Sequence, residues 1–333
     1  MFFAGLMNFI VDPYGVYNTG LVPRGDINHY DKKLDMFIEF RPPAEAVIIG
    51  SSRVLSYDPD VVTELTGKSC FNFWLPGART ETYYAVMRLL LDNGADIDMV
   101  ILAIEPESFH PSLPVEPEAR FTPEYSKYFI YNPEIRSNAF QKAGLLFSFS
   151  QMGESITQIN RLIKAQAGQD KLDYRPNGFA TWRHWEKQIE DGTFNLESRI
   201  DERVRKYAER SMGLSDFNSV GATRMKYWED FLSICSERNI RVVAFIPPNH
   251  PRLAKILREL EADSVIATVS DYLAETISGV GGVFADYSDI ESFSGDPNDF
   301  YDEIHMRPKN GELLLKHLFS HNAGNRSYEE EHE

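Results

Sequence analysis

The stretch AVIIGSSR, residues 46–53, largely decides the fold of this 333-residue chain. Its first five residues form a short apolar run of the kind that builds strands buried on both faces. Gly50 then lets the backbone turn sharply, and Ser51 and Ser52 open the next turn. In an open α/β sheet, ligands bind beyond the carboxyl ends of the strands. The segment therefore predicts a buried strand with a candidate site directly after it.

Four further apolar runs predict strands of the same kind. They are Ser69–Phe73, Met99–Ile104, Arg241–Ile246 and Gly282–Asp286. Segments with helical periodicity separate most of these runs: Glu81–Leu91, Met225–Ser236 and the leucine-rich Asn310–Leu318. This alternation predicts an α/β protein in which a doubly wound, five-stranded parallel sheet lies between two helical layers, a three-layer αβα (flavodoxin-like) fold.

The alternation stops between about residues 105 and 221. This stretch is rich in proline and aromatic residues, and it holds two plausible helices, Ile156–Gln166 and Leu196–Ser211, but no convincing strand. We interpret it as a large, mostly helical insertion between the third and fourth strands, forming a lid or side wall over the site. Its aromatic residues can stack on a sugar ring, but packing in the core or lid is the favoured interpretation: Tyr174, Phe179, Trp182 and Trp185.

Composition narrows the class of function. The chain is 43% hydrophobic and 25% charged, as expected of a globular protein, and its formal net charge is -16. An acidic surface repels phosphate backbones, so nucleic acid is a poor candidate partner. Cys70 and Cys235 lie in apolar runs and are interpreted as buried free thiols. The sequence shows neither the spacing of a zinc site nor a glycine-rich phosphate loop, so no metal or cofactor is expected.

The N-terminus permits two interpretations. Residues 1–11, MFFAGLMNFIV, carry no charge, but a membrane span needs about 20 apolar residues. Residues 1–20 are either the remnant of a membrane anchor or a first helix that packs on the domain. Residues 21–322 are then one domain with its insertion, and residues 323–333 are an acidic tail that ends in Glu329–Glu333.

A second group of polar residues, Asp302-Glu303-Ile304-His305, precedes the last helix. A serine hydroxyl is a poor nucleophile until a base removes its proton, and histidine suits that task at neutral pH. An aspartate three residues earlier can reach the same ring and fix its tautomer. Taken separately, Ser51 or Ser52 can be a helix N-cap, and His305 can lie in an exposed turn. Taken together, they are expected to meet at one edge of the sheet.

The order of these motifs resembles the SGNH (GDSL-like) hydrolase superfamily. Gly-Ser-Ser follows strand one, a glycine follows strand two, and Asp-x-x-His precedes the last helix. The likeness is closest to membrane-anchored cell-envelope branches, namely the DltD-like proteins of teichoic-acid D-alanylation and the AlgX/AlgJ-like alginate O-acetylation proteins. Residues 11–15, VDPYG, resemble the segment after the anchor helix of those proteins, which favours the anchor interpretation of the N-terminus. Residues 243–248 resemble their fourth strand and its exit loop.

The resemblance implies a role for each matched residue. Ser52 matches the nucleophile, Asp302 and His305 match the base pair, and the N–H groups of Ser52 and Gly77 match the oxyanion hole. Gly77 is equally well explained as a plain turn after a proline.

The sequence departs from the family pattern after the third strand. The family's asparagine is absent from Ala103-Ile104-Glu105-Pro106-Glu107, and an ionised Glu105 cannot donate a hydrogen bond. Loss of one such donor typically costs about 10²–10³ in rate. Arg53 and Glu105 are the candidate substrate-binding residues. Arg53 is expected either to supply positive charge or bind an acidic sugar, or to be a surface salt-bridge residue.

The resemblance implies a serine-dependent esterase or O-acyltransferase that acts through an acyl-enzyme on acylated cell-envelope or exported polysaccharide. It also implies an extracytoplasmic protein tethered by its N-terminus, with a membrane-bound acyl-transfer partner and no cofactor. The missing asparagine motivates an alternative, a catalytically inactive glycan-binding or assembly protein on the same scaffold. A flavodoxin-like nucleotide or cofactor binder shares the sheet but lacks a phosphate loop, and it ranks last.

Overall fold

A five-stranded parallel sheet forms the centre of the computed structural model, in the order β2-β1-β3-β6-β7. The structure describes residues 2–13, 15–17, 19–22, 29–132, 139–166, 172–209, 217–260 and 262–323. The strands are β1 (Ala46–Gly50), β2 (Cys70–Trp74), β3 (Met99–Ala103), β6 (Arg241–Ile246) and β7 (Val283–Asp286). They confirm the predicted strands, with ends that differ by one residue at β2, β3 and β7.

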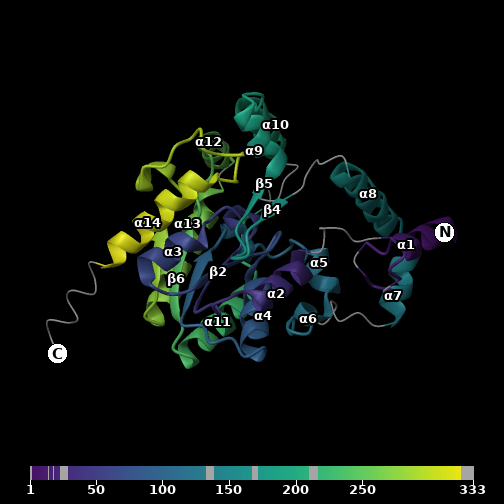
Figure 1. Cartoon of the computed structure of the whole chain (residues 1–333), viewed down its shortest axis with the longest axis horizontal. Coiled ribbons are helices and arrows are strands. Elements are labelled where there is room, and N and C mark those ends of the chain that lie inside the picture. The colour runs from purple at the N-terminus through teal and green to yellow at the C-terminus, as the bar shows by residue number, and fades with distance from the viewer. Residues whose placement is uncertain are drawn as a thin grey trace.

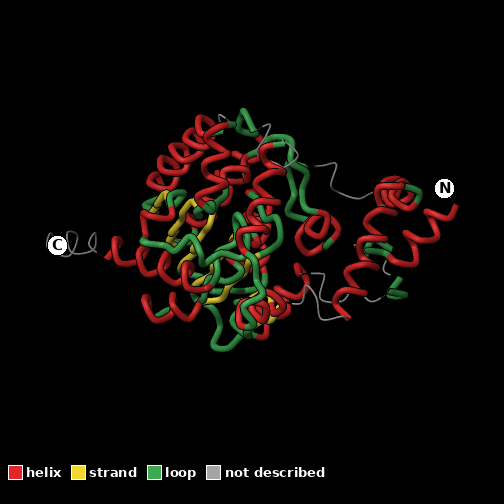
Figure 2. The backbone as a smooth tube through the Cα atoms, turned by 90° about the horizontal axis from the view of Figure 1, so that it is seen from above, coloured by secondary structure: helices red, strands yellow, loops and turns green. Residues whose placement is uncertain are grey.

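Helices cover both faces of the sheet, which confirms the three-layer prediction (Figures 1 and 2). Val47 and Ile49 of β1 pack toward one helical layer, whereas Ile48 packs toward the other. Every residue of β1 is buried, which is why its sequence is a continuous apolar run rather than an alternating one. The first layer contains α4 (Thr80–Asp92), α11 (Ala222–Glu237), α12 (Pro251–Glu259) and α13 (Asp263–Gly279), and the second contains α3 (Pro59–Thr66) and α14 (Pro308–Ala323).

The insertion after β3 is mostly helical, as predicted. Its helices are α5 (Pro117–Phe121), α6 (Pro123–Ser126), α7 (Ala139–Leu146), α8 (Phe149–Gln166), α9 (Arg183–Glu190) and α10 (Leu196–Ala208). The expected helix at 196–211 thus ends at Ala208, and Ser211 lies outside the described residues.

The expectation that the insertion holds no strand was wrong. β4 (Leu172–Tyr174) and β5 (Ala180–Trp182) form an antiparallel hairpin. Each strand has only three residues, too few for an alternating pattern to stand out. A signal was nevertheless present, because Asn-Gly at 177–178 is a strong hairpin-turn sequence.

The turn of this hairpin covers the edge of the main sheet. The N–H of Asn72 in β2 donates to the carbonyl of Asn177 at 2.8 Å. Gly178 has a φ of 83°, and a Cβ there would clash with the Asn72 carbonyl. The buried Lys33 of α2 (His29–Glu39) donates from Nζ to the carbonyls of Asn72 and Gly178, at 2.7 and 2.5 Å. The unpaired edge of β2 is therefore closed by main-chain contacts.

The first helix, α1 (Phe2–Val11), lies beside α7 and α8, away from the sheet (Figures 1 and 2). In the described part of the chain, no helix has the length and apolar character needed to cross a membrane. Cys70 and Cys235 are buried free thiols, as predicted. The acidic run Glu329–Glu333 lies outside the described residues.

Candidate active site

Ser52 begins a short 3₁₀ turn, η2 (Ser52–Val54), directly after β1. A Cβ at Gly50 would lie 2.9 Å from a methyl of Val54 and 3.3 Å from the carbonyl oxygen of Ala103, so the turn can fold this tightly only beside a glycine. The hydroxyl of Ser51 caps the turn by accepting from the N–H of Arg53 at 3.1 Å. The capping role therefore belongs to Ser51, and the half-buried Ser52 hydroxyl makes a different contact.

That contact joins two segments that lie far apart in the sequence. The Oγ of Ser52 lies 2.9 Å from Nε2 of His305, 253 positions away. The other ring nitrogen, Nδ1, lies 2.9 Å from both carboxylate oxygens of Asp302. Asp302 and His305 are buried, and the three side chains form a continuous hydrogen-bonded series. The structure thus brings together the three residues that the sequence predicted to meet.

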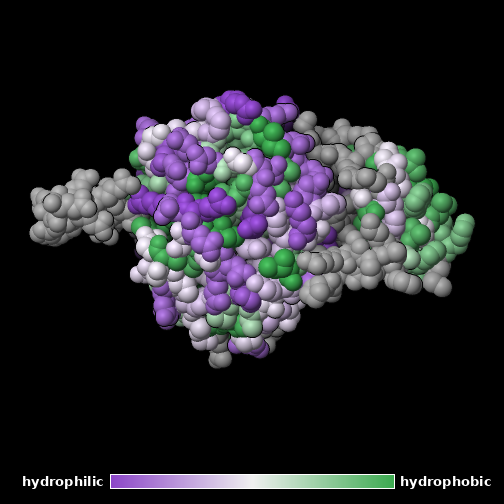
Figure 3. All heavy atoms as spheres, turned by 90° about the horizontal axis from the view of Figure 1, so that it is seen from below, coloured by the Kyte–Doolittle hydropathy of each residue, from purple (hydrophilic) through white to green (hydrophobic). Residues whose placement is uncertain are grey.

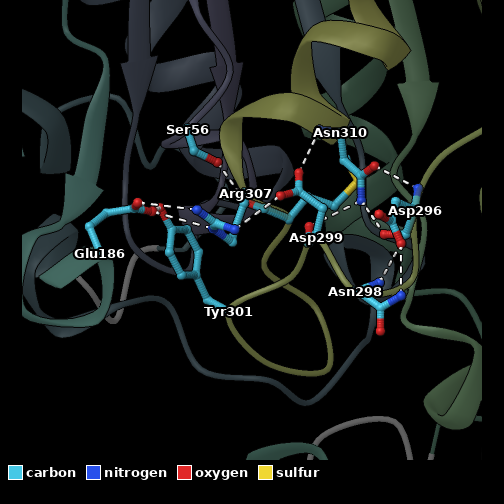
Figure 4. A network of polar contacts seen from close by, with 9 residues as sticks. Ser56, Glu186, Asp296, Asn298, Asp299, Tyr301, Arg307 and Asn310 are labelled. Carbon is cyan, nitrogen blue, oxygen red and sulfur yellow. Dashed lines mark hydrogen bonds and ion pairs between the residues drawn. The ribbon is translucent and has the colours of Figure 1, made fainter. Parts of the chain in front are cut away.

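The loop that carries Asp302 and His305 is anchored from several sides (Figure 4). The hydroxyl of Ser56 donates to the carbonyl of Met306 at 2.7 Å. Arg307 forms ion pairs with Asp299 and with Glu186 of α9, both at 3.3 Å. Further along, Asn310 at the start of α14 donates to the carbonyls of Asp296 and Asp299: 2.8 and 3.0 Å. These contacts hold the loop in place before the chain enters α14.

Asp302 is held in its ionised form. Burial alone would raise the pKa of this carboxyl group. The charge of His305 and the hydrogen bonds to Asp302 outweigh that effect and lower its pKa below the usual range. The bonds include the backbone N–H groups of Ile304 and His305, at 3.1 and 2.9 Å. An ionised Asp302 accepts the Nδ1 proton of His305 and leaves Nε2 free to take a proton from Ser52.

Gly77 lies in the loop after β2, which is tied to the nucleophile turn because the N–H of Leu75 donates to the carbonyl of Gly50 at 3.1 Å. The φ of Gly77 is 56°, and a Cβ there would clash with the side chain of Glu116. The position therefore requires glycine for its backbone, which satisfies the turn interpretation. Within the described part of the chain, neither the Ser52 N–H nor the Gly77 N–H donates to a protein acceptor.

Glu105 follows β3, at the position where the SGNH pattern has asparagine. The Oγ of Ser51 donates to Oε1 of Glu105 at 2.5 Å, so the carboxyl group braces the residue next to Ser52. Burial of Glu105 raises its pKa to about 7, against an opposing effect from the charge of Arg53. A carboxyl group with this pKa is partly protonated at neutral pH. In the protonated fraction Glu105 has a proton to donate, which the ionised carboxylate lacks.

Arg53 is not a surface residue, so the salt-bridge alternative was wrong. Its side chain is 4% exposed and donates to the carbonyls of Pro247 and Pro248, at 3.2 and 2.5 Å. The Nε atom is buried without a hydrogen-bond partner among the described residues. The sequence did not reveal this, because the pattern of a three-residue turn does not show which way its second side chain points.

Arg53 also lines a cavity of about 410 Å³ beyond the carboxyl ends of β6 and β7. Ser52, Asp302 and His305 do not line it, so the cavity adjoins the nucleophile turn only through Arg53. Its charged lining is mixed, with more acidic than basic side chains: Arg53, Glu107, Arg258, Asp263, Asp289 and Glu291.

One aromatic side chain of the insertion, Trp182, contacts the histidine directly. The ring of Trp182 meets the ring of His305 edge to face, with centroids 4.9 Å apart. Trp185 lies against Trp182, with centroids 4.6 Å apart, and the guanidinium of Arg199 lies 4.0 Å over Trp185. Both tryptophans are partly exposed. The sequence favoured simple packing for them, because the hairpin that carries Trp182 to the site was not foreseen.

Two other aromatic residues of the insertion do not contact His305. Tyr174 stacks on Trp74, and Phe179 is buried beneath Arg175. Among the residues whose placement is described, no group of three or more potential ligands is positioned to hold a metal ion.

Comparison with known proteins gives a family but no activity. The family model described as "Protein of unknown function (DUF1574)" matches residues 44–321, which include the whole parallel sheet, the insertion and all three residues of the Ser52–His305–Asp302 series. No curated protein matches the chain.

Proposed function

The chain belongs to the DUF1574 family, and we propose that it is a serine-dependent esterase or O-acyltransferase. The observation that carries the proposal is the hydrogen-bonded series from Ser52 through His305 to Asp302. A nucleophile, a base and a group that orients the base are the minimum set for acyl transfer, and they are recognised by geometry rather than by order in the chain.

In the first half-reaction, Ser52 Oγ attacks the carbonyl carbon of an ester as its proton passes to Nε2 of His305. The carbonyl oxygen gains the electron pair and becomes an oxyanion, with the N–H groups of Ser52 and Gly77 as its donors. The bond from carbon to the alcohol oxygen then breaks. The alcohol leaves with the proton from His305, and an acyl-enzyme remains on Ser52.

In the second half-reaction, His305 takes a proton from an incoming hydroxyl group. That oxygen attacks the acyl carbon, and Ser52 leaves with the proton returned from His305. Water as the attacking group makes the protein an esterase, and a sugar hydroxyl makes it an O-acyltransferase. Throughout, Asp302 stays ionised and stabilises the imidazolium form of His305.

We propose an O-acylated carbohydrate of the cell envelope or an exported polysaccharide as the substrate. The partly exposed Trp182 and Trp185 beside His305 support a ring-shaped substrate, because aromatic faces offer large apolar contact areas with fixed geometry. Arg53, which is part of the nucleophile turn, and Glu105, which accepts from Ser51 beside it, are the proposed substrate-binding residues. The extracytoplasmic location and the membrane-bound partner implied by the family resemblance remain part of this proposal.

The alternative is a glycan-binding or assembly protein that has lost catalysis. Its motivation is the glutamate at position 105, where a neutral amide would be a permanent donor. The raised pKa of Glu105 weakens that motivation, because a protonated carboxyl group can also donate. The 2.9 Å contact between Ser52 and His305 favours the enzyme, since binding alone does not require a base on the serine.

Reaction of the intact protein with a fluorophosphonate, followed by mass measurement, tests the proposal. The wild-type chain is expected to gain one adduct, and Ser52→Ala and His305→Ala should each lose it. Turnover of a small aryl ester should fall at least about 10³-fold in both variants. The matched control is Ser51→Ala, which removes the neighbouring hydroxyl and should keep the adduct.

Two results would contradict the proposal. A folded Ser52→Ala protein that still forms the adduct would assign the reactivity to another residue. A folded wild-type protein that neither forms the adduct nor turns over the ester would favour the glycan-binding alternative.

A further inference from the structure

Three helices at one end of the molecule reverse the usual distribution of polar and apolar side chains. This end cluster consists of α1, α7 and α8 (Figures 1 and 2). Phe2 and Phe3 of α1 are 82% and 73% exposed, whereas Asn8 on the same helix is fully buried. In a helix that faces water, the apolar stripe is buried and the polar face is exposed.

Polar contacts hold the interior of the end cluster together. Nδ2 of Asn8 donates to the carbonyls of Leu146 and Ser148, at 2.9 and 3.0 Å. Its Oδ1 accepts from the hydroxyl of Ser155 in α8 at 3.0 Å. Two more polar side chains of α8 are buried: Gln151 and Gln158. Asn8 therefore fastens α1 to both neighbouring helices by its polar group.

Small residues allow the close approach. Ala4 is buried, and a Cβ at Gly5 would lie 2.9 Å from the ring of Phe147. Small residues and polar side chains at the contacts between helices are characteristic of helices packed in lipid, where apolar surface gains nothing by turning inward. The interior of the end cluster follows that rule rather than the rule for a water-soluble core.

The exterior of the cluster is a broad apolar surface, visible as the green region at the end of the molecule in Figure 3. It is formed by Phe2, Phe3, Leu6, Phe9 and Ile10 of α1, Phe147 before α8, and Phe149, Ile156 and Ile163 of α8. Contiguous exposed patches of this kind mark interaction surfaces, whereas single exposed apolar residues do not.

The charge of the cluster identifies the surface that it fits. α1 carries no charged residue. α7 and α8 carry three basic residues against one acidic residue: Lys142, Arg161 and Lys164 against Glu154. The sequence of the helices that carry the apolar surface is thus net positive within an acidic protein, whose formal net charge is -16, and this is the composition that an anionic lipid surface attracts.

We propose that the end cluster inserts its apolar face into the surface of an anionic phospholipid bilayer. In this arrangement the exposed apolar side chains of α1 enter the interfacial region of the bilayer together with those of α8. Two of the three helices come from the insertion after β3, so the insertion contributes to membrane contact as well as to the wall of the site. The proposal does not depend on the chemistry of Ser52.

Vesicle flotation of the full chain tests the proposal. Wild type is expected to float with phosphatidylcholine vesicles that contain phosphatidylglycerol, and less with phosphatidylcholine alone. The triple variant Phe2→Ser/Phe3→Ser/Phe149→Ser should lower the ratio of bound to free protein at least about 100-fold. The matched control replaces three exposed apolar residues outside the cluster, Ile38→Ser/Leu65→Ser/Ile130→Ser, and should float like wild type.

The thermal transition and the circular dichroism spectrum in solution check that both triple variants are folded. Wild-type protein that stays with neither kind of vesicle would overturn the proposal, as would equal flotation of the two triple variants. Light scattering measures the oligomeric state and so tests the alternative that a second copy of the chain covers the apolar surface. A dimer that dissociates in the cluster variant, combined with no flotation of wild type, would assign the apolar surface to self-association instead.

Discussion

Asp302 is the residue on which the proposed base depends. Replacement by asparagine keeps the shape of the side chain but removes the charge that selects the tautomer of His305. Asp302→Asn should lower kcat by about 10³–10⁴-fold, with little change in KM. Steady-state kinetics with a small aryl ester measures the effect, and Asp289→Asn, at the exposed cap of η5 (Ile290–Phe293), is the matched control. Equal loss of activity in both variants would contradict the role given to Asp302.

Glu105 gives a prediction for stability against pH. Its pKa is raised from 4.5 to about 7 by burial, so the folded state binds a proton more tightly than the unfolded state. The free energy of unfolding therefore falls as pH rises from about 4.5 to 7. Above that range, the cost of burying the ionised Glu105 carboxylate is constant. Glu105→Gln keeps an acceptor for the Ser51 hydroxyl and removes that cost. We expect this variant to be more stable than wild type by about 3 kcal/mol at pH 8, and the gain to vanish near pH 4.5.

Urea unfolding at several pH values measures this difference. Glu45→Gln is a suitable control, because Glu45 is an exposed residue just before β1 that accepts from the N–H of Ser69. An increase in the free energy of unfolding that is equal at pH 4.5 and pH 8 would show that Glu105→Gln acts through packing. It would not then act through the ionisation of Glu105.

At the residue scale, the sequence located the groups but not all of their orientations. Ser52, Asp302 and His305 meet as predicted, because strand ends in a parallel sheet converge on one edge; their catalytic role stays a prediction. The burial of Arg53 could not be predicted, because it depends on Pro247 and Pro248, nearly 200 positions away. The raised pKa of Glu105 likewise arises from tertiary burial.

At the scale of elements, the β4–β5 hairpin connects the sheet to the site. Its turn pairs with β2, and its second strand ends at Trp182, against His305. The sequence contained the Asn-Gly signal of this turn. The two strands beside it could not be recognised, because each has only three residues of mixed polarity. The five main strands were predictable because burial on both faces makes each a continuous apolar run.

Gly178 offers a direct test of how firmly the hairpin is held. Gly178→Ala places a methyl group against the Asn72 carbonyl, which is backbone and cannot move aside. Gly67→Ala is the matched control, because Gly67 also has a positive φ, 72°, but no neighbour within 4 Å of an added Cβ. We expect a loss of about 1 kcal/mol at Gly67 and about 3 kcal/mol at Gly178. Urea unfolding measures both, and equal losses would mean that the turn does not press on β2.

At the scale of the whole molecule, the sheet was predictable but the end cluster was not. A charge-free first helix fits both a membrane anchor and a helix packed on the domain, so the sequence left both interpretations open. The structure packs α1 on α7 and α8 through Asn8, and this contact spans about 140 positions. Periodicity reports which face of a helix is apolar, but not whether that face turns toward the protein or away from it.

The net charge of the whole chain, -16, leads to the last prediction. A negative protein repels a negative substrate, and salt screens that repulsion over a distance of about 10 Å at 0.1 M. Two esters with the same leaving group, p-nitrophenyl acetate and the anionic p-nitrophenyl succinate, separate this effect from chemistry. Between low and high salt, kcat/KM for the anionic ester should rise about threefold or more, with no change for the neutral one. A fall for the anionic ester would instead mean that the buried charge of Arg53 dominates the field at Ser52 and attracts acidic substrates.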